Sequence, residues 1–297
     1  MNANILTDPS VAFDTQAPAR VVSLVPSTTA SLVDLGLSAV LVGITDFCDL
    51  PALGENAVRR VGGPRSLDVD AILALRPDLI LANQEENDQA AVEALAGAGL
   101  PVWLAFPRTV RAAINDLWTL ANLFRSDQAM AQVAMLEKGA EWAGLAASGQ
   151  PSVRYFCPIW QEAPESGPPW WMTFNADTYA ADVLALFGGE NIFGARARRY
   201  PLEADLGLGE AEPANERDTR YPRVTREEIL AGEPELILLP SEPFVYTDAH
   251  AAEFLALFED TPAARAGRIF TLDGTLITWH GTRIAKAFEE LPNLFNV

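Results

Sequence analysis

Asp68 to Leu81 reads DVDAILALRPDLIL, and 157 residues later Thr225 to Leu238 reads TREEILAGEPELIL. The two segments align without a gap and share seven residues, namely Ile72/Ile229, Leu73/Leu230, Ala74/Ala231, Pro77/Pro234, Leu79/Leu236, Ile80/Ile237 and Leu81/Leu238. Each copy begins with a residue that can cap a helix, continues with apolar residues at helical spacing, breaks at a proline and ends in an apolar run typical of a buried strand. The pattern predicts one helix–strand unit in each half of the chain. A chance likeness is the alternative, because such units favour Leu, Ile, Ala and Pro.

The elements around each copy repeat as well. In the first half, Val21–Val25 has the pattern of a short strand, and a helix follows from Pro26 until Gly36 stops it. In the second half, Val153–Cys157 is the matching strand and Thr178–Phe187 is the matching helix. Strands that alternate with helices favour parallel sheets with right-handed crossovers. The sequence therefore predicts an α/β fold with two similar domains.

The predicted boundaries divide the chain into four segments. These are a loose N-terminal segment (1–19), an N-terminal α/β lobe (20–125), a linking helix (126–149) and a C-terminal α/β lobe (150–297). Ser126 can cap the linking helix, whose about 21 residues would form a rod on the order of 30 Å. Residues 201–220 are rich in Gly, Pro and charge, and we expect a long exposed loop there.

Composition narrows the class of protein. The chain has 297 residues, 49% of them hydrophobic and 21% charged, which is typical of an ordinary globular protein. Its net charge of −19 argues against nucleic acid as a partner. The first 20 residues show no export signal, so we expect either a cytoplasmic protein or one whose leader has been removed. Cys48 and Cys157 are expected to be free thiols.

Sequence motifs for catalysis are absent. The chain contains no GxSxG elbow, no GxxxxGK[ST] phosphate loop and no GxGxxG after a strand. Its two histidines, His250 and His280, belong to no metal-binding cluster, and a bare transition-metal site needs three or four ligands. We therefore assign no catalytic residue, no metal site and no cofactor.

Aromatic side chains gather in the predicted loops. The loop TDFCDLP places Phe47 beyond the carboxyl end of a strand, where parallel sheets bind ligands. Comparable positions hold six further rings and one histidine, namely Trp160, Trp170, Trp171, Phe174, Phe244, Trp279 and His280. These rings either pack under the loops as core or bind a large, flat, partly apolar ligand. His280 could ligate a metal inside that ligand or act as a plain hydrogen-bonding group.

Asp70 and Glu227 occupy equivalent positions in the two copies. If Asp68 and Thr225 are the N-caps, both carboxylates lie in the first turn of a helix, where the helix dipole stabilises them by about 0.3–1 kcal/mol. Glu228 can complete a capping box with Thr225. The functional alternative is that one carboxylate on each domain docks a basic pocket on each half of a two-fold partner.

Six stretches of the chain resemble a known family. RVVSLVPSTTASLVDLGL, LVGITDFCDLP, LDVDAILALRPDLIL, ADVLALFGGENIF, YPRVTREEILAGEPELILL and WHGTRIAKAFEEL occur in the order found in the helical-backbone (class III) periplasmic substrate-binding proteins of ABC importers, which bind cobalamin and iron chelates. The likeness covers about residues 20 to 293. It implies two Rossmann-like lobes joined by one rigid helix, with ligand held in a cleft between the lobes.

The resemblance also implies roles for residues. One acidic residue on each lobe pairs with arginines of the permease dimer, and Asp70 and Glu227 match these by position. Phe47 and Trp171 resemble positions that line a cobalamin pocket. Departures are Phe187, where the resembled cobalamin receptor has a disulfide cysteine, and the long insertion at 201–220.

The expected function is a monomeric, non-catalytic receptor for a corrinoid or another metal chelate. It would act in the periplasm, or anchored outside the cytoplasm, if a leader has been removed. A cytoplasmic binding or sensor protein of the same fold, for a tetrapyrrole or siderophore, is the first alternative. An enzyme acting on such a ligand is the second. The sequence alone does not identify the chelate.

Overall fold

The computed structural model describes three stretches of the chain, residues 3–48, 58–164 and 167–295. The chain divides into two compact units, residues 1–139 with 279–285 and residues 140–278 with 286–297. Each unit contains a parallel sheet, so the predicted α/β fold with parallel sheets is confirmed.

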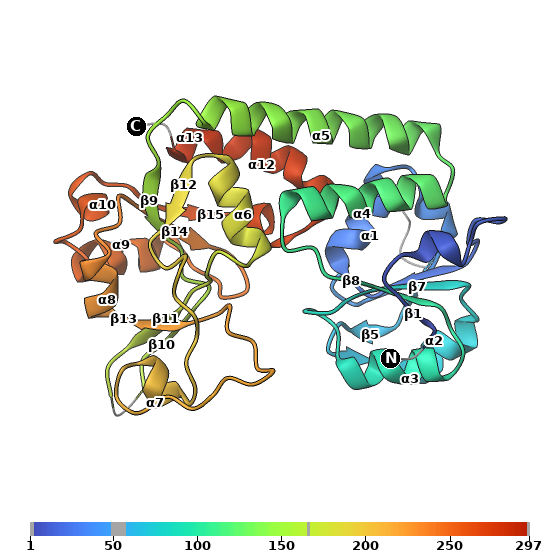
Figure 1. The fold of residues 1–297 in the computed structure, drawn as a ribbon, viewed down its shortest axis with the longest axis horizontal. Helices are drawn as coiled ribbons and strands as arrows, with labels where there is room; N and C mark the ends of the chain where they lie inside the picture. Colours follow the sequence, from blue (N-terminus) through green and yellow to red (C-terminus); the bar gives the residue numbers. More distant parts are fainter. Residues whose placement is uncertain (1–2, 49–57, 165–166, 296–297) are drawn as a thin grey trace. The chain divides into compact units, whose positions relative to one another are not determined.

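The first unit is a sheet covered by helices on both faces. Within the described residues its strands run in the order β1-β8-β7-β2-β3-β4, and every neighbouring pair is parallel. The strands are β1 (Ile5–Leu6), β2 (Val21–Ser23), β3 (Leu41–Ile44), β4 (Arg59–Arg60), β7 (Leu79–Asn83) and β8 (Val102–Ala105), and a short antiparallel pair is formed by β5 (Gly62–Gly63) and β6 (Ser66–Leu67). The helices that cover the sheet are α1 (Pro26–Asp34), α2 (Val69–Leu75), α3 (Gln89–Gly97) and α4 (Val110–Leu123). In Figure 1, α1 and α4 lie on one face of the sheet, and α2 and α3 lie on the other.

The N-terminal segment is ordered into the sheet, which corrects the prediction of a loose leader. Ile5 pairs with Val102 and Leu6 with Trp103, so β1 extends the parallel sheet beyond β8. A 3-10 turn follows at Pro9–Val11. The physical reason is that β8 would otherwise be an edge strand with unpaired backbone groups, and two residues of the leader satisfy them.

The repeated segments fold as the same helix–strand unit. Asp68 caps α2 by accepting the N–H of Ala71, and Thr225 caps α8 (Arg226–Ala231) through a capping box with Glu228, as predicted. The units end in the central strands β7 and β14 (Leu236–Pro240). The equivalence extends to backbone conformation, because Arg76 and Glu233 both have positive φ values, 46° and 44°.

The second unit contains a smaller parallel sheet in the order β12-β9-β14-β15 within the described residues. Its other strands are β9 (Val153–Phe156), β12 (Gly189–Asn191) and β15 (Ile269–Leu272). Its helices are α6 (Tyr179–Leu186), α7 (Leu202–Asp205), α8, α9 (Asp248–Leu257), α10 (Pro262–Arg265), α11 (Thr275–Thr278), α12 (Ile284–Glu290) from its third residue onward, and α13 (Pro292–Phe295). The sheet and α9 share an aromatic core in which Phe156, Phe254 and Phe258 pack edge to face or tilted.

A second sheet of this unit is antiparallel and was not predicted. It pairs β10 (Trp160–Glu162), β11 (Trp170–Met172) and β13 (Arg223–Thr225). The insertion at 201–220 is also more ordered than the exposed loop that the sequence predicts. Its helix α7 buries Asp205 completely, and that carboxylate accepts backbone N–H groups from Arg199 and Arg223. A buried carboxylate with these donors fixes the path of the insertion.

The long helix α5 (Asp127–Ala147) is continuous, and the division between the units falls within it at Gly139. The prediction put all residues from 150 onward in the second lobe, but residues 279–285 pack in the first unit. They do so through Thr282, whose N–H donates to Ser31 Oγ and whose hydroxyl donates to Asp34. Gly281 permits this approach, since it has φ +86° and a Cβ there would collide with Ser31 Oγ.

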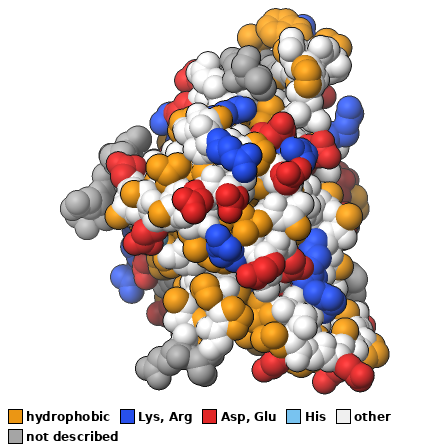
Figure 2. Space-filling view, turned by 90° about the vertical axis from the view of Figure 1, so that its left-hand side faces the viewer, with side chains coloured by type: hydrophobic (Ala, Val, Ile, Leu, Met, Phe, Trp, Pro, Cys, Tyr) orange, Lys and Arg blue, Asp and Glu red, His pale blue; other side chains and the backbone are white. Residues whose placement is uncertain are grey.

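Charged and apolar side chains are interspersed on the surface that Figure 2 shows, over α8, α9 and α10. The net charge of −19 is therefore not gathered into one acidic patch on this face. Cys48 and Cys157 are both buried free thiols, as predicted. No helix in the described part of the chain has the length and hydrophobicity needed to cross a membrane.

Candidate functional site

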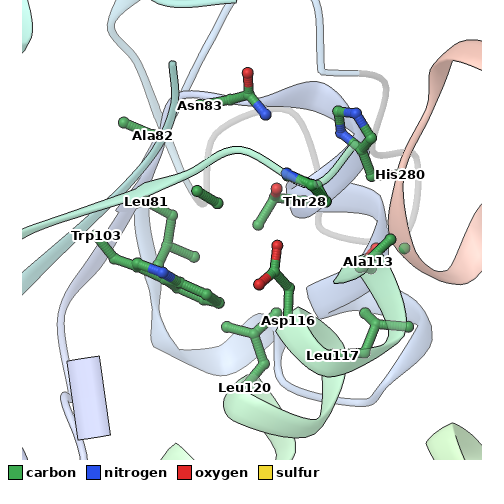
Figure 3. A pocket seen from close by; sticks show the side chains of 14 residues that line it. Thr28, Leu81, Ala82, Asn83, Trp103, Ala113, Asp116, Leu117, Leu120 and His280 are labelled. Carbon is green, nitrogen blue, oxygen red and sulfur yellow. The ribbon is translucent and has the colours of Figure 1, made fainter. Parts of the chain in front are cut away.

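The first unit has a small cavity at the carboxyl ends of β7 and β8. Its volume is about 30 Å³, room for one or two water molecules. Asn83 ends β7, Ala105 ends β8, and both line the cavity. Thr28, in the first turn of α1, and His280 add further polar groups to the wall (Figure 3). Parallel α/β sheets bind ligands at this end of their strands, which makes the cavity a candidate site.

Asp116 reaches this cavity from α4. The helix turns Ala113, Leu117 and Leu120 toward the protein interior, and Asp116 lies on the same face. In Figure 3 its carboxyl group points toward Thr28 with the indole of Trp103 beside it. Among the described residues its carboxyl has no hydrogen-bond or ion-pair partner, and burial raises its pKa to about 7. Near neutral pH it can therefore act as a hydrogen-bond donor or as an acceptor.

His280 lines the same cavity, and Trp279 beside it is half-buried. Burial lowers the pKa of the His280 imidazole to about 4, so the ring is neutral at physiological pH. The structure thus brings one predicted site residue, His280, together with a carboxyl that the sequence analysis did not select. Asp116 could have been found as a charged residue on the apolar face of an amphipathic helix.

The second unit gathers several of the predicted aromatic residues. Trp160, 39% exposed, contacts Phe244 edge to face with ring centroids 5.5 Å apart. Phe244 in turn contacts Tyr246 at 4.7 Å and His250 at 5.6 Å. This Trp160 cluster follows the carboxyl ends of β9 and β14, so its place in its own sheet matches that of the cavity in the first unit.

A shallow hollow of about 410 Å³ lies at the carboxyl ends of β14 and β15. Ser241, Leu272 and Asp273 line it at the strand ends, and Tyr246 and Asp248 line it from the loop and helix that follow β14. Burial raises the pKa of the Tyr246 phenol, and its buried hydroxyl has no hydrogen-bond partner in the described structure. Tyr246 therefore links the hollow to the Trp160 cluster.

Two predicted site residues belong to the core instead. Trp171 is 3% exposed and packs against Phe254 and Phe258, and Phe174 is 1% exposed. Their burial contradicts a position on the ligand-facing surface and favours the alternative that these rings support the loops. The reason for Trp171 is the alternation of β11, which turns it inward while its neighbour Trp170 stays half-buried beside Arg223.

Phe47 remains on the surface, 70% exposed, beside Gly63. Its loop was predicted through Pro51, but residues 49–51 lie outside the described residues. Asp70 and Glu227 are both exposed in the first turns of α2 and α8, at the equivalent positions predicted. Among the described residues neither carboxylate has a hydrogen-bond or ion-pair partner, so both are available to an external one.

The chain matches a known protein family. The family model of the periplasmic binding proteins matches residues 21–276. The chain belongs to the periplasmic binding protein family. A vitamin B12-binding protein of Yersinia pestis is 28% identical over 228 residues, which cover 75% of this chain and 70% of the relative. The same match is found with the vitamin B12-binding protein of Yersinia pseudotuberculosis.

Solved structures agree in fold. The periplasmic vitamin B12-binding protein of Vibrio cholerae has a TM-score of 0.70 at 19% identity, over 94% of this chain and 96% of that one. A periplasmic heme-binding protein of Pseudomonas aeruginosa has a TM-score of 0.67 at 24% identity, over 94% and 92%. These relatives are binding proteins, and the recognition of a binding-protein family from the sequence is confirmed.

Proposed function

We propose that this protein captures a corrinoid outside the cytoplasm and delivers it to an ABC permease, without catalysing a reaction. The observation that carries the proposal is the 28% identity with vitamin B12-binding proteins over three quarters of the chain. The periplasmic character of the family supports the location. Heme and other iron chelates are the competing ligands, because structural relatives of similar fold are named for them.

Ligand capture would rest on aromatic rings at the strand ends of each unit. Phe47 and Trp160 expose ring surface, and Trp170, Phe244 and Trp279 are half-buried, so apolar faces of a macrocycle can be covered by them. His280 is half-buried and neutral, so its imidazole could hydrogen-bond a side arm or ligate a metal in the macrocycle. Trp171 and Phe174 would hold the loops in place from the core.

Delivery would use the carboxylates of Asp70 and Glu227. Each is the exposed, unpaired acid in the first turn of its helix, and the two positions are equivalent in the repeat. Basic pockets of a permease dimer would each receive one carboxylate. Such rim charges set association rate and orientation more than ligand affinity.

Tryptophan fluorescence tests the ligand. Cobalamin should quench the emission of the purified protein with saturation at or below tens of micromolar, and heme should bind more weakly. Trp160→Ala should weaken cobalamin binding about tenfold or more, as the loss of a central aromatic contact typically does. Trp142→Phe is the control, since Trp142 is an exposed ring of α5 outside the proposed site. Unquenched emission, or tighter binding of heme, would reject the corrinoid assignment.

Transport assays with the cognate permease test delivery. Asp70→Ala and Glu227→Ala should abolish docking and uptake while cobalamin affinity stays unchanged. Asp127→Ala is a matched control, because Asp127 is also an exposed carboxylate in the first turn of a helix. Loss of cobalamin affinity in the Asp70 or Glu227 variant would contradict the docking role.

A further inference from the structure

Six arginines lie between residues 196 and 223 of the second unit, out of 21 basic residues in the whole chain. They are Arg196, Arg198, Arg199, Arg217, Arg220 and Arg223. The segment joins β12 to β13 and carries the insertion with α7.

Three of the six arginines are paired with carboxylates. Arg196 bonds the buried Asp205 at 3.1 Å, Arg217 lies 3.6 Å from Glu212, and Arg220 bonds Asp218 at 2.6 Å. These pairs account for the folding of the insertion. They leave Arg198, Arg199 and Arg223 without an ion-pair partner among the described residues.

Arg198 is held in place without an acceptor for its guanidinium. Its backbone N–H donates to Thr219 O at 2.8 Å, and its guanidinium carbon lies 4.2 Å from the ring centroid of Tyr200. The Nε atom is buried and has no hydrogen-bond partner in the described structure. A buried donor of a charged group without an acceptor is unfavourable unless something outside the chain supplies one.

Arg223 is a second arginine without an ion-pair partner in the described structure, although its guanidinium has a backbone acceptor. Its guanidinium donates to the carbonyl of Tyr221 at 2.8 Å and lies 5.8 Å from the ring centroid of Trp170. Burial, followed by the charge of Arg198, lowers the pKa of the Arg223 guanidinium. The buried Asp205 carboxylate brings the two segments together, because its oxygens accept the backbone N–H groups of Arg199 at 2.9 Å and Arg223 at 2.7 Å.

Neutralising groups are near in sequence but do not pair with these cations. Glu203, Glu210 and Glu216 of the same segment are exposed and form no ion pair within the described residues. The charge of Arg198 does reach Asp218, yet that carboxylate is occupied by Arg220. The fold therefore keeps two like charges close together, and neither guanidinium forms an ion pair with the Asp205 or Asp218 carboxylate that acts on it from nearby.

We propose that Arg198 and Arg223, flanked by Tyr200 and Trp170, form a subsite for an oxyanion, a phosphate or carboxylate group carried by the bound ligand. Guanidinium groups bind such planar or tetrahedral oxyanions through paired N–H donors. Bound oxygen atoms would supply the acceptor that Arg198 Nε lacks and offset the repulsion between the two arginines. The inference rests on the proposed function for the source of the anion, but the site itself can be tested without it.

Inorganic phosphate is the first probe. Calorimetric titration of the whole protein at constant ionic strength should detect saturable phosphate binding. Arg198→Gln and Arg223→Gln should each weaken it about tenfold or more, the usual cost of losing a hydrogen bond to a charged group. Arg217→Gln is the matched control, since Arg217 lies against the same Tyr200 ring at 4.1 Å but has its own carboxylate. Equal weakening in all three variants, or no binding by the unchanged protein, would overturn the subsite.

A pair of corrinoids separates this inference from the proposed function. Cobalamin carries a phosphodiester in its nucleotide loop, and cobinamide lacks it. Arg198→Gln should lower affinity for cobalamin about tenfold or more and leave affinity for cobinamide unchanged. Equal losses for both corrinoids would contradict anion recognition. If the unchanged protein binds phosphate but neither corrinoid, the proposed function fails while the oxyanion subsite stands. Thermal unfolding of each variant checks that the fold is intact.

Discussion

Helix α2 leads into strand β7 in the first unit, and α8 leads into β14 in the second, with the same local devices in both. Asp78 accepts the N–H of Arg20 at 2.9 Å, and Glu235 accepts the N–H of Arg154 at 2.9 Å, so each acid holds the backbone at the start of the neighbouring strand, β2 or β9. What differs is the chemistry beyond the strand ends. The first unit places an unpaired carboxyl, Asp116, in a small cavity, whereas the second places arginines and aromatic rings around an insertion.

The comparison separates scaffold from specificity. Positions that the repeat conserves between the two units are caps, buried strand residues and strand-holding acids, all of which stabilise the fold. Positions that differ lie in the segments after the strands, where a ligand would be met. A duplicated scaffold can therefore present two different surfaces to one ligand without changing its own packing.

The largest expected effect tests the equivalence of the two scaffolds. Ile80 and Ile237 are matched, fully buried residues of the central strands. Replacing either by Ala should lower the free energy of unfolding by roughly 2–5 kcal/mol, because each change leaves a cavity. Chemical denaturation followed by circular dichroism measures the loss. A cost below about 1 kcal/mol at one position would show that the two copies are not equivalent in packing.

The buried carboxyl of Asp116, a feature of the first unit, should make the stability of the protein depend on pH. Its pKa is raised by burial from 3.8 to about 7, so the folded state holds the proton more tightly than the unfolded chain. That stabilisation is complete below about pH 4 and is lost as pH rises to about 7. Asp116→Asn should therefore raise the free energy of unfolding by up to about 4 kcal/mol at pH 8 and change little at pH 4.

His280, in the same cavity, should give the free energy of unfolding the opposite dependence on pH. Its pKa is lowered from 6.5 to about 4, so its contribution is present above pH 6.5 and is lost as pH falls toward 4. His280→Gln should remove this loss of stability at acidic pH, which denaturation of the variant and the unchanged protein at pH 4 and pH 8 measures.

The Asp116 prediction has its own contradicting outcome. If Asp116→Asn changes the free energy of unfolding equally at both pH values, the carboxyl is not desolvated in the cavity.

The helix caps give a smaller difference between the copies. Thr225→Ala and Asp68→Ala should each cost about 1 kcal/mol, since each removes one side-chain acceptor at a helix N-terminus. Glu228→Ala should cost more than a simple surface change, because Glu228 also pairs with Arg196 at 3.3 Å. Thermal unfolding measures these changes in stability. If the Glu228 variant is as stable as the unchanged protein, the capping box does not contribute to stability.

Asp70→Ala and Glu227→Ala should have the smallest effect on stability. Each loses only a favourable interaction with the helix dipole, about 0.3–1 kcal/mol. Thermal unfolding at low and high salt measures it, and the difference should shrink in salt. A loss of several kcal/mol would mean that these carboxylates serve the fold and not an external partner.

The helices and strands of the scaffold could be predicted from the sequence because they depend on local residue patterns. The caps at Asp68 and Thr225, the glycine stop at Gly36 and the buried runs of β7 and β14 all agree with the observed elements. The pairing of β1 with β8 was not predictable, since a two-residue strand has no periodicity. The antiparallel sheet of β10, β11 and β13 was missed because each strand has three residues, too few to show a periodicity.

The candidate sites were only partly predictable. Exposed aromatic residues such as Phe47 and Trp160 follow from their loop positions, but burial of Trp171 depends on a strand that the sequence did not reveal. Asp116 and Arg198 owe their character to residues distant in sequence, which desolvate one and leave the other without an acceptor. Such properties arise from packing and cannot be read from spacing alone.

The segment 279–285 has a consequence for how the polypeptide matures. Thr282 completes the surface of α1 near Ser31 and Asp34, about 250 positions earlier in the chain. The ribosome must therefore synthesise the chain through this segment before the first unit can close. An isolated fragment ending at residue 139 would leave Ser31 and Leu117 uncovered at the position that Gly281 occupies in the folded chain.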